Sequence, residues 1–357
     1  MTITHRIRNV ALVICLFVVP LWSQDLPSRI SDEEFWRMVS EFSEDGGYFQ
    51  FDNFMSNEDT LQWVIPDLKL RTKPGGVFIG VGPEQNFTYL AALESKMVFI
   101  IDLRRQNMLE HLIYKALFEM SADRAEFVSR LFSRPRPSGL DTSSTAAMMF
   151  ERFKLISGDM KLLAENKRRV IDHLNRRGFK LSQDDLDRMD YIYGAFFEGG
   201  PDLTFAPTRF FNGGQTTYST LMTATDQQGE ARSFLSSEDK FRYVQDLQKK
   251  NLIVPLVGDF AGTKAIRVVG EYIRSRGATV TAFYASNVEQ YLFQNTEEWK
   301  RFYRNLETLP VDESSTFIRS FTPLPGGKWF SAIASIKDGL KAFSDGRIRS
   351  YADIMPR

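Results

Sequence analysis

The stretch Gly76–Asp102 limits the possible folds of this chain more than any other, because it has the pattern of a strand, a glycine turn, a helix and a second strand. Its apolar runs follow in the order Val77–Val81, Phe87–Leu93 and Met97–Ile101, with Gly80-Val81-Gly82 closing the first. This pattern predicts a βαβ unit with two parallel strands.

Asp102 follows the glycine turn at a spacing that suits a nucleotide-type pocket. It lies twenty residues after Gly82, directly after the second strand-like run. At about this spacing a carboxylate at the end of the second strand reaches a ribose hydroxyl beside the turn. A dinucleotide fingerprint would have a third glycine where Gln85 stands, so a tight turn without a ligand is the alternative reading.

Strand-like and helix-like segments alternate again in the second half of the chain. We expect strands at Thr216–Ala224, Leu252–Val257, Ala278–Tyr284 and Thr316–Phe321, and helices at Ser236–Lys250 and Thr263–Arg276. A late turn is expected at 323–327, and the tail after it has no clear pattern. The sequence therefore predicts an α/β, Rossmann-like fold, with a mostly parallel sheet and helices on both faces.

A long helical segment separates these two α/β halves. Asn107 with Glu110 resembles the start of a helix, a capping box is expected at Ser182 and Asp185, and the pattern stays helical to Glu198. We expect a signal peptide at 1–23, a leading segment with the first βαβ half at 24–107, a helical insertion at 108–200, and the second half of the same domain at 201–357. The insertion should pack against the sheet as a cap, because its apolar stripes need a surface to cover them.

The first residues have the pattern of a targeting segment. Arg6 and Arg8 precede an uncharged apolar run from Val10 to Trp22, which is too short for a comfortable membrane span. We expect cleavage after Ser23 and an exported protein, periplasmic or extracellular. The alternative is an uncleaved segment that anchors the protein to a membrane.

Composition and histidine content exclude several kinds of site. Lys plus Arg and Asp plus Glu both number 45, so no charge excess favours a nucleic-acid partner. Cys15 is the only cysteine and would leave with the signal peptide. His111 and His173 have no ligand-like spacing to carboxylates; we expect both on helix surfaces, and no metal site.

Polar residues at the predicted strand ends are the candidates for binding a small molecule, because α/β sheets bind ligands there. In chain order they are Gly80, Gly82 and Glu84, then Asp102, then Asp259, and finally Tyr284 with Ser286 and Asn287. Asp259 is the candidate general base, although an acid after a strand often only caps a helix. Asn57 and Glu58 are possible rim residues, with a solvated turn as the alternative.

Several enzyme classes have no motif in this chain. It contains no Gly-x-Ser-x-Gly elbow, no Gly-Lys-Ser/Thr phosphate loop and no His-Glu-x-x-His. The block VFIGVGPEQNFTYL followed by FIID resembles the glycine turn and second-strand acid of class I S-adenosylmethionine-dependent methyltransferases. VPLVGDFAG resembles their fourth-strand motif.

The methyltransferase resemblance implies specific roles. Gly80, Gly82, Glu84 and Tyr284 would lie around S-adenosylmethionine, Asp102 would bind its ribose, and Asp259 would lie near the transferred methyl group. The chain departs from the family at Glu84, where a glycine is common, and it lacks a recognisable third strand.

A second resemblance covers most of the mature chain. GVGPEQNFTY, LFEMSADRAEFVSRLFSRP, VPLVGDFAG and ASNVEQYL resemble an uncharacterised family of bacterial proteins. That family brings no activity, and an export signal is unusual for an enzyme with a cytoplasmic cofactor. The sequence therefore leaves open whether the chain is an enzyme. It is either a methyltransferase or a non-catalytic exported protein that binds a ligand or partner on a degenerate methyltransferase fold.

Overall fold

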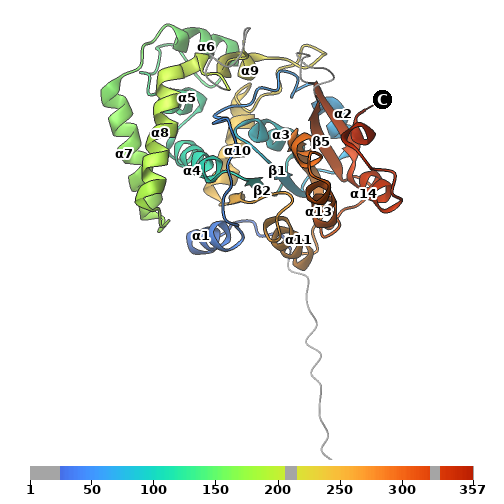
Figure 1. Ribbon diagram of the computed structural model, residues 1–357. Coiled ribbons are helices and arrows are strands. Elements are labelled where there is room, and N and C mark those ends of the chain that lie inside the picture. Colours follow the sequence, from blue (N-terminus) through green and yellow to red (C-terminus); the bar gives the residue numbers. More distant parts are fainter. Residues whose placement is uncertain (1–24, 206–214, 322–329, 357) are drawn as a thin grey trace, which may run out of the picture.

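The computed structural model describes residues 25–205, 215–321 and 330–356 (Figure 1). The expected signal peptide at 1–23 and the expected turn at 323–327 lie outside the described residues. Within the described ranges, no helix has the length and apolar character needed to cross a membrane.

One six-stranded sheet, in the order β3-β2-β1-β4-β5-β6, forms the centre of the molecule. Its strands are β1 (Val77–Gly80), β2 (Met97–Asp102), β3 (Ile253–Val257), β4 (Val280–Ser286), β5 (Thr316–Phe321) and β6 (Phe330–Ser335). The first five are parallel, and β6 runs antiparallel to β5 at the edge. The predicted α/β, Rossmann-like fold is confirmed.

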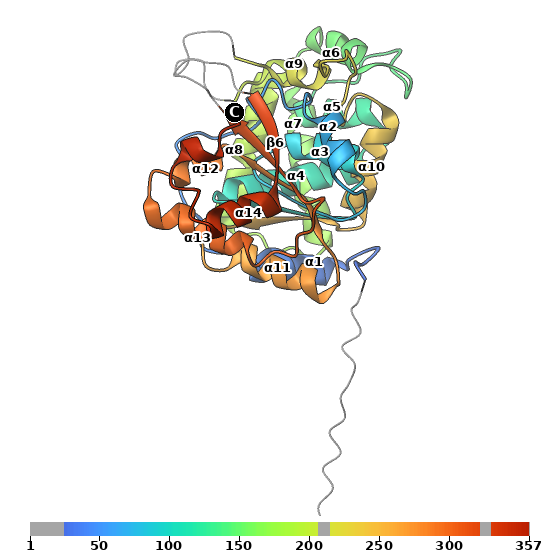
Figure 2. The same cartoon turned by 90° about the vertical axis from the view of Figure 1, so that its right-hand side faces the viewer.

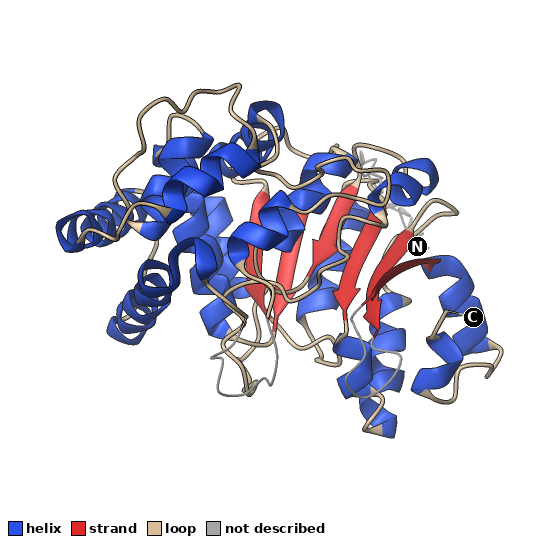
Figure 3. Ribbon diagram, turned by 90° about the horizontal axis from the view of Figure 1, so that it is seen from above, coloured by secondary structure: helices blue, strands red, loops and turns tan. Residues whose placement is uncertain are grey.

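Helices cover both faces of the sheet (Figures 1 and 2). One face carries α3 (Gln85–Leu93), α4 (Arg105–Met120) and α10 (Glu238–Lys249), and the other carries α1 (Asp32–Glu41), α11 (Ala265–Ser275) and α13 (Thr296–Leu306). The strands lie between these two layers (Figure 3). Every residue of β1, β2, β3 and β5 is therefore buried, which explains why these strands are continuous apolar runs without alternation.

The structure describes eight further α-helices. They are α2 (Ile65–Arg71), α5 (Arg124–Phe132), α6 (Ala146–Lys154), α7 (Met160–Arg176), α8 (Gln183–Gly199), α9 (Tyr218–Thr223), α12 (Val288–Leu292) and α14 (Ile336–Ser344). Many helices begin at a Ser, Thr, Asp or Asn whose side chain accepts a backbone N–H of the first turn. The predicted capping box of Ser182 and Asp185 is confirmed.

Two local predictions are wrong. The expected strand Thr216–Ala224 contains α9, because Thr217 accepts the N–H of Thr220 as an N-cap and so overrides the strand propensity of its neighbours. The helix expected to start near Asn107 starts at Arg105, and both Asn107 and Glu110 are buried inside it.

Within the helical segment, α4 packs on the sheet and later helices pack on α4. α5, α7 and α8 contact α4, and α4 in turn contacts β2 and β3. Arg177, at the end of α7, ties these layers together. Its guanidinium donates to Glu119 on α4, to Asp32 on α1 at 2.5 Å and to Asn251 before β3 at 2.8 Å.

We predict that Arg177→Met lowers the free energy of unfolding by about 2–3 kcal/mol, because it leaves buried acceptors without their charged donor. The control is Arg168→Met on the same helix, whose ion pair with Asp172 is exposed and should matter by at most about 0.5 kcal/mol. Urea unfolding of both variants measures the difference. Equal losses would mean that Arg177 does not tie α7 to α4.

Candidate functional site

A cavity of about 460 Å³ lies where β1 and β4 are neighbours. From these two central strands the chain continues to opposite sides of the sheet, which is the place where open α/β sheets bind ligands. Four strand ends contribute to its wall: Gly82 after β1, Asp102 of β2, Asp259 after β3, and Ser286 of β4. The leading segment adds Asn57 and Glu58, together with aromatic side chains.

The sequence-predicted residues divide into two groups. Gly82, Asp102 and Asp259 line the cavity together. Gly80, Glu84 and Tyr284 do not line it, and Glu84 and Tyr284 have no exposed surface. Their roles are therefore indirect, as the contacts below describe.

The glycine turn is fixed from the side of α3 by one buried amide. Asn86 Nδ2 donates to the carbonyl oxygens of Val81 at 3.0 Å, Gly82 at 3.1 Å and Pro83 at 2.8 Å. Gly80 makes room for this amide, because a Cβ atom there would lie 2.0 Å from Asn86 Oδ1. Gly82 has a φ of +75°, which other residues rarely adopt. Both glycines thus shape the turn, and only Gly82 reaches the cavity.

Glu84 binds the leading segment instead of a ligand. Its carboxyl oxygens accept the N–H of Ser56 at 3.2 and 3.3 Å. Burial raises the pKa of Glu84 to about 8, and the nearby Glu58 adds to this shift. The glycine that methyltransferases often have here is replaced by a side chain that holds residues 56–58 over the end of β1.

Tyr284 positions Glu58. Its hydroxyl donates to Glu58 Oε1 at 2.6 Å and accepts from Gln85 Nε2 at 3.1 Å. Ser286 Oγ donates to the same Glu58 oxygen at 2.5 Å. Burial raises the pKa of Glu58. Glu58 is therefore a wall residue of the cavity held by β4, and the alternative of a solvated turn at this position is wrong.

Asp102 is already paired. Its Oδ1 accepts from the Arg104 backbone N–H at 2.8 Å and from Nε at 3.1 Å, and its Oδ2 accepts from Nη2 at 3.1 Å. A carboxylate has about four lone-pair positions. Asp102 can thus accept one further hydrogen bond from a ligand, where the resemblance implied a free ribose-binding acid.

Asp259 follows β3, not the fourth strand that the resemblance implied. β3 pairs with β2 at the edge of the sheet, so Asp259 lies beside Asp102, and two strands, β2 and β1, separate β3 from β4. The sequence could not reveal this, because the long helical segment between β2 and β3 made the third strand look like the fourth. The third strand thought to be missing is therefore β3.

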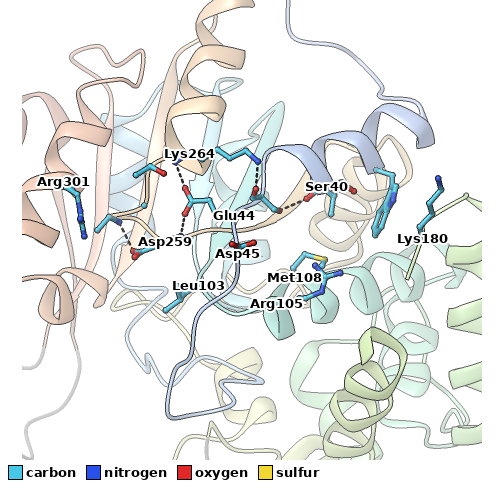
Figure 4. Close-up of a pocket in the computed structure, with 16 residues that line it drawn as sticks. Ser40, Glu44, Asp45, Leu103, Arg105, Met108, Lys180, Asp259, Lys264 and Arg301 are labelled. Atoms are coloured by element: carbon cyan, nitrogen blue, oxygen red, sulfur yellow. Dashed lines mark hydrogen bonds between the residues drawn. The ribbon is translucent and has the colours of Figure 1, made fainter. Parts of the chain in front are cut away.

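A second, more open groove of about 1040 Å³ lies on the other side of Asp259 (Figure 4). Glu44 from the leading segment occupies the start of α11 there. Its carboxylate accepts the backbone N–H groups of Lys264 at 2.5 Å and Ala265 at 2.7 Å. The unpaired N–H groups that begin a helix are thus satisfied by the chain itself.

Both histidines have roles that sequence reasoning missed. His111 is 1% exposed, and its Nε2 lies 2.9 Å from the carbonyl oxygen of Gly82, so the expectation of a surface residue is wrong. Burial lowers the pKa of His111 to about 4. His173 is partly buried and lies 2.6 Å from Glu119. Within the described ranges, no three His, Cys, Asp or Glu side chains are grouped to hold a metal ion.

Comparison with protein families matches residues 53–142 and 198–340 to a domain of unknown function, DUF7790. The chain belongs to this family. Its description names no activity, and no curated protein matches the chain. The matched ranges of the DUF7790 domain hold the glycine turn, all six described strands, and α4 and α5. The unmatched stretch 143–197 holds α6, α7 and most of α8.

We predict that stability falls as the pH rises from about 4.5 to about 8 because of Glu84. With a folded pKa of about 8 against an ordinary 4.5, Glu84 keeps its proton in the fold after the unfolded chain has released it. The free energy of unfolding therefore decreases between these two values. His111 acts in the opposite direction, but only between pH 4 and 6.5.

Between pH 6.5 and 8 the wild type should lose about 2 kcal/mol more than Glu84→Gln. Urea unfolding across this window, with the exposed acid variant Glu33→Gln as a control, measures the difference. Parallel curves for wild type and Glu84→Gln would mean that Glu84 is not the titrating group.

Proposed function

We propose that the cavity binds S-adenosylmethionine and that the protein is a methyltransferase acting on a small molecule. The observation that carries this proposal is the meeting of Gly82, Asp102 and Asp259 in one cavity at the switch point of the sheet. The cavity volume of about 460 Å³ is in the range that buries a cofactor of this size.

The charge of the wall supports a cationic ligand. Four acids line the cavity, and among its described lining residues Arg104 is the only base. The acids are Glu58, Asp102, Asp259 and Glu298. Arg104 is already bound by Asp102 and by the carbonyl oxygen of Asp52. A ligand with a sulfonium and an ammonium group would compensate this excess of negative charge.

Each part of the cofactor has a matching group. The remaining acceptor position of Asp102 suits a ribose hydroxyl, and Asp259 beside it suits the amino group of the base. Leu103 and Phe260 provide apolar surface in the wall of the same cavity. S-adenosylmethionine, when bound, supplies a methyl group made electrophilic by the sulfonium.

A second candidate function is ligand binding outside the cytoplasm without catalysis. The Asp102–Arg104 pair favours it, because a carboxylate that already accepts three hydrogen bonds is a weaker ribose ligand. The Arg-flanked apolar run near the N-terminus also supports this second function, since S-adenosylmethionine is made in the cytoplasm.

We predict that S-adenosylmethionine and S-adenosylhomocysteine bind the wild type, and that Asp102→Asn weakens both at least tenfold. A charge-assisted hydrogen bond contributes about 1.5–3 kcal/mol, and about 1.4 kcal/mol is one decade of affinity. Isothermal titration calorimetry measures the affinities. Asp123→Asn is the matched control, because it removes an acid that Arg136 binds through two nitrogens outside the cavity.

The two candidate functions predict different cofactor affinities for Asp102→Asn. Asp102→Asn should lower the melting temperature in both, because Arg104 loses part of its partner, so stability does not discriminate. Unchanged cofactor affinity in Asp102→Asn would support the second function. If the wild type shows no heat with millimolar S-adenosylmethionine, the methyltransferase proposal fails.

We also propose that the protein is exported, and we predict that the mature chain begins near Gln24. The support is the apolar run from Val10 to Trp22 after Arg6 and Arg8. N-terminal sequencing of the protein from fractionated cells measures this directly. A cytoplasmic protein that retains Met1 would contradict export, and a membrane fraction with an intact N-terminus would indicate an anchor.

A further inference from the structure

Two buried side chains at the β4 end of the cavity offer hydrogen-bond acceptors that have no donor. Glu58 is 3% exposed, and its Oε1 accepts from Tyr284 and Ser286 while its Oε2 has no partner. Gln85 is also 3% exposed, and its Oε1 has no partner. Both residues line the cavity.

The hydrogen-bond chain explains why both free atoms are acceptors. The Tyr284 hydroxyl has one hydrogen, which it donates to Glu58 at 2.6 Å. It must therefore accept from the Gln85 amide, whose Nε2 lies 3.1 Å away. This orientation leaves the Gln85 carbonyl oxygen free. One hydroxyl thus joins the two side chains, so both residues with a free oxygen lie in one small region of the wall.

No charged side chain in the described lining of the cavity supplies the missing donors, and outside that lining the Ser320 hydroxyl also acts on Glu58 and lowers its pKa against the effect of burial. Arg104 is its only base, and that guanidinium already bonds to Asp102 and to the Asp52 carbonyl. Buried acceptors without donors cost free energy, and a carboxylate away from water needs a positive partner. A ligand that brings several N–H donors and a positive charge would satisfy both needs.

We propose that the β4 end of the cavity is a binding site for a protonated amine, with Glu58 as its counter-ion and Gln85 as a second acceptor. An ammonium group has three N–H donors and no acceptor, which matches two neighbouring side chains that each have an acceptor without a donor. Phe49 and Tyr291 line the same cavity and contact each other, with ring centroids 5.3 Å apart. Their rings add surface for an apolar or aromatic carrier of the amine.

The amine has two possible sources. It is either the amino group of the amino-acid tail of the cofactor or a separate small amine that serves as substrate. The first source rests on the proposed function, whereas the second can be tested without any nucleoside. The two sources require different probes.

Isothermal titration calorimetry with three probes separates these cases. S-adenosylhomocysteine carries a nucleoside and an amine, 5′-methylthioadenosine carries the nucleoside alone, and 2-phenylethylamine carries the amine alone. The test variant is Glu58→Gln, whose amide oxygen still accepts from Tyr284 and Ser286. The matched control is Glu298→Gln, which also removes one negative charge from the wall.

A cofactor amine predicts that Glu58→Gln weakens S-adenosylhomocysteine at least tenfold and changes 5′-methylthioadenosine less than twofold. A separate amine predicts that 2-phenylethylamine, alone or with saturating 5′-methylthioadenosine, binds the wild type and weakens at least tenfold in Glu58→Gln. In both cases Glu298→Gln should change affinity less than twofold. Gln85→Met should weaken the same amine about threefold, and it replaces Glu58→Gln as the test if that variant does not fold.

The proposal is overturned if no amine-bearing probe binds at millimolar concentration, or if amine binding does not change in Glu58→Gln. Equal losses in Glu58→Gln and Glu298→Gln would also overturn it, because they would indicate a general charge effect. If only 2-phenylethylamine binds and depends on Glu58, the amine site stands and the methyltransferase proposal fails.

Discussion

The site depends on three hydrogen bonds from the buried amide of Asn86 to the carbonyl groups of residues 81–83. They hold the glycine turn in place, and they require the space that Gly80 leaves beside Asn86. The neighbouring residues of the motif use the same turn as an anchor. Glu84 fixes Ser56, and Gln85 bonds to Tyr284. Most residues of this motif, which resembles a cofactor-binding loop, therefore hold the loop in place. Of its two glycines, only Gly82 lines the cavity.

Three carboxyl groups lie buried around this turn, and burial makes each of them harder to ionise. Burial raises the pKa values of Glu58, Glu84 and Glu110, and both oxygens of Glu110 have no partner. Burying such groups costs stability, which the aromatic core around Phe87 and Phe118 must offset. Only Glu58 of the three reaches the cavity. Ionisable groups with shifted pKa values beside a pocket are common at functional sites, and Glu58 is such a group here.

Sequence patterns predicted most of the strands, which depend on consecutive residues. They did not predict strand order or side-chain contacts, which depend on residues far apart in the chain. The apolar runs marked β1 to β5, because strands buried on both faces need them. They did not give the order of the strands, so Asp259 was assigned to the wrong one. β6 is only half-buried along its length, so it lacks such a run. His111 and Tyr284 were misjudged because their partners, Gly82 and Glu58, come from other segments. Glu58 had no motif of its own and was recognised only as a possible rim residue.

The positions of the acids along the sheet indicate which chemical groups a ligand needs in order to bind in the cavity. Asp102 and Asp259 follow the neighbouring strands β2 and β3, whereas Glu58 is held by β4 on the other side of β1. Apolar side chains, among them Met55 and Val81, line the wall as well. A ligand that satisfies this wall needs donors at both ends and an apolar or aromatic middle. A nucleoside with a cationic tail has this pattern in one molecule, and a nucleoside beside a separate amine has it in two. Both alternatives make the same demands on Asp102 and on Glu58, so what distinguishes them is whether the amine binds as part of the nucleoside or without it.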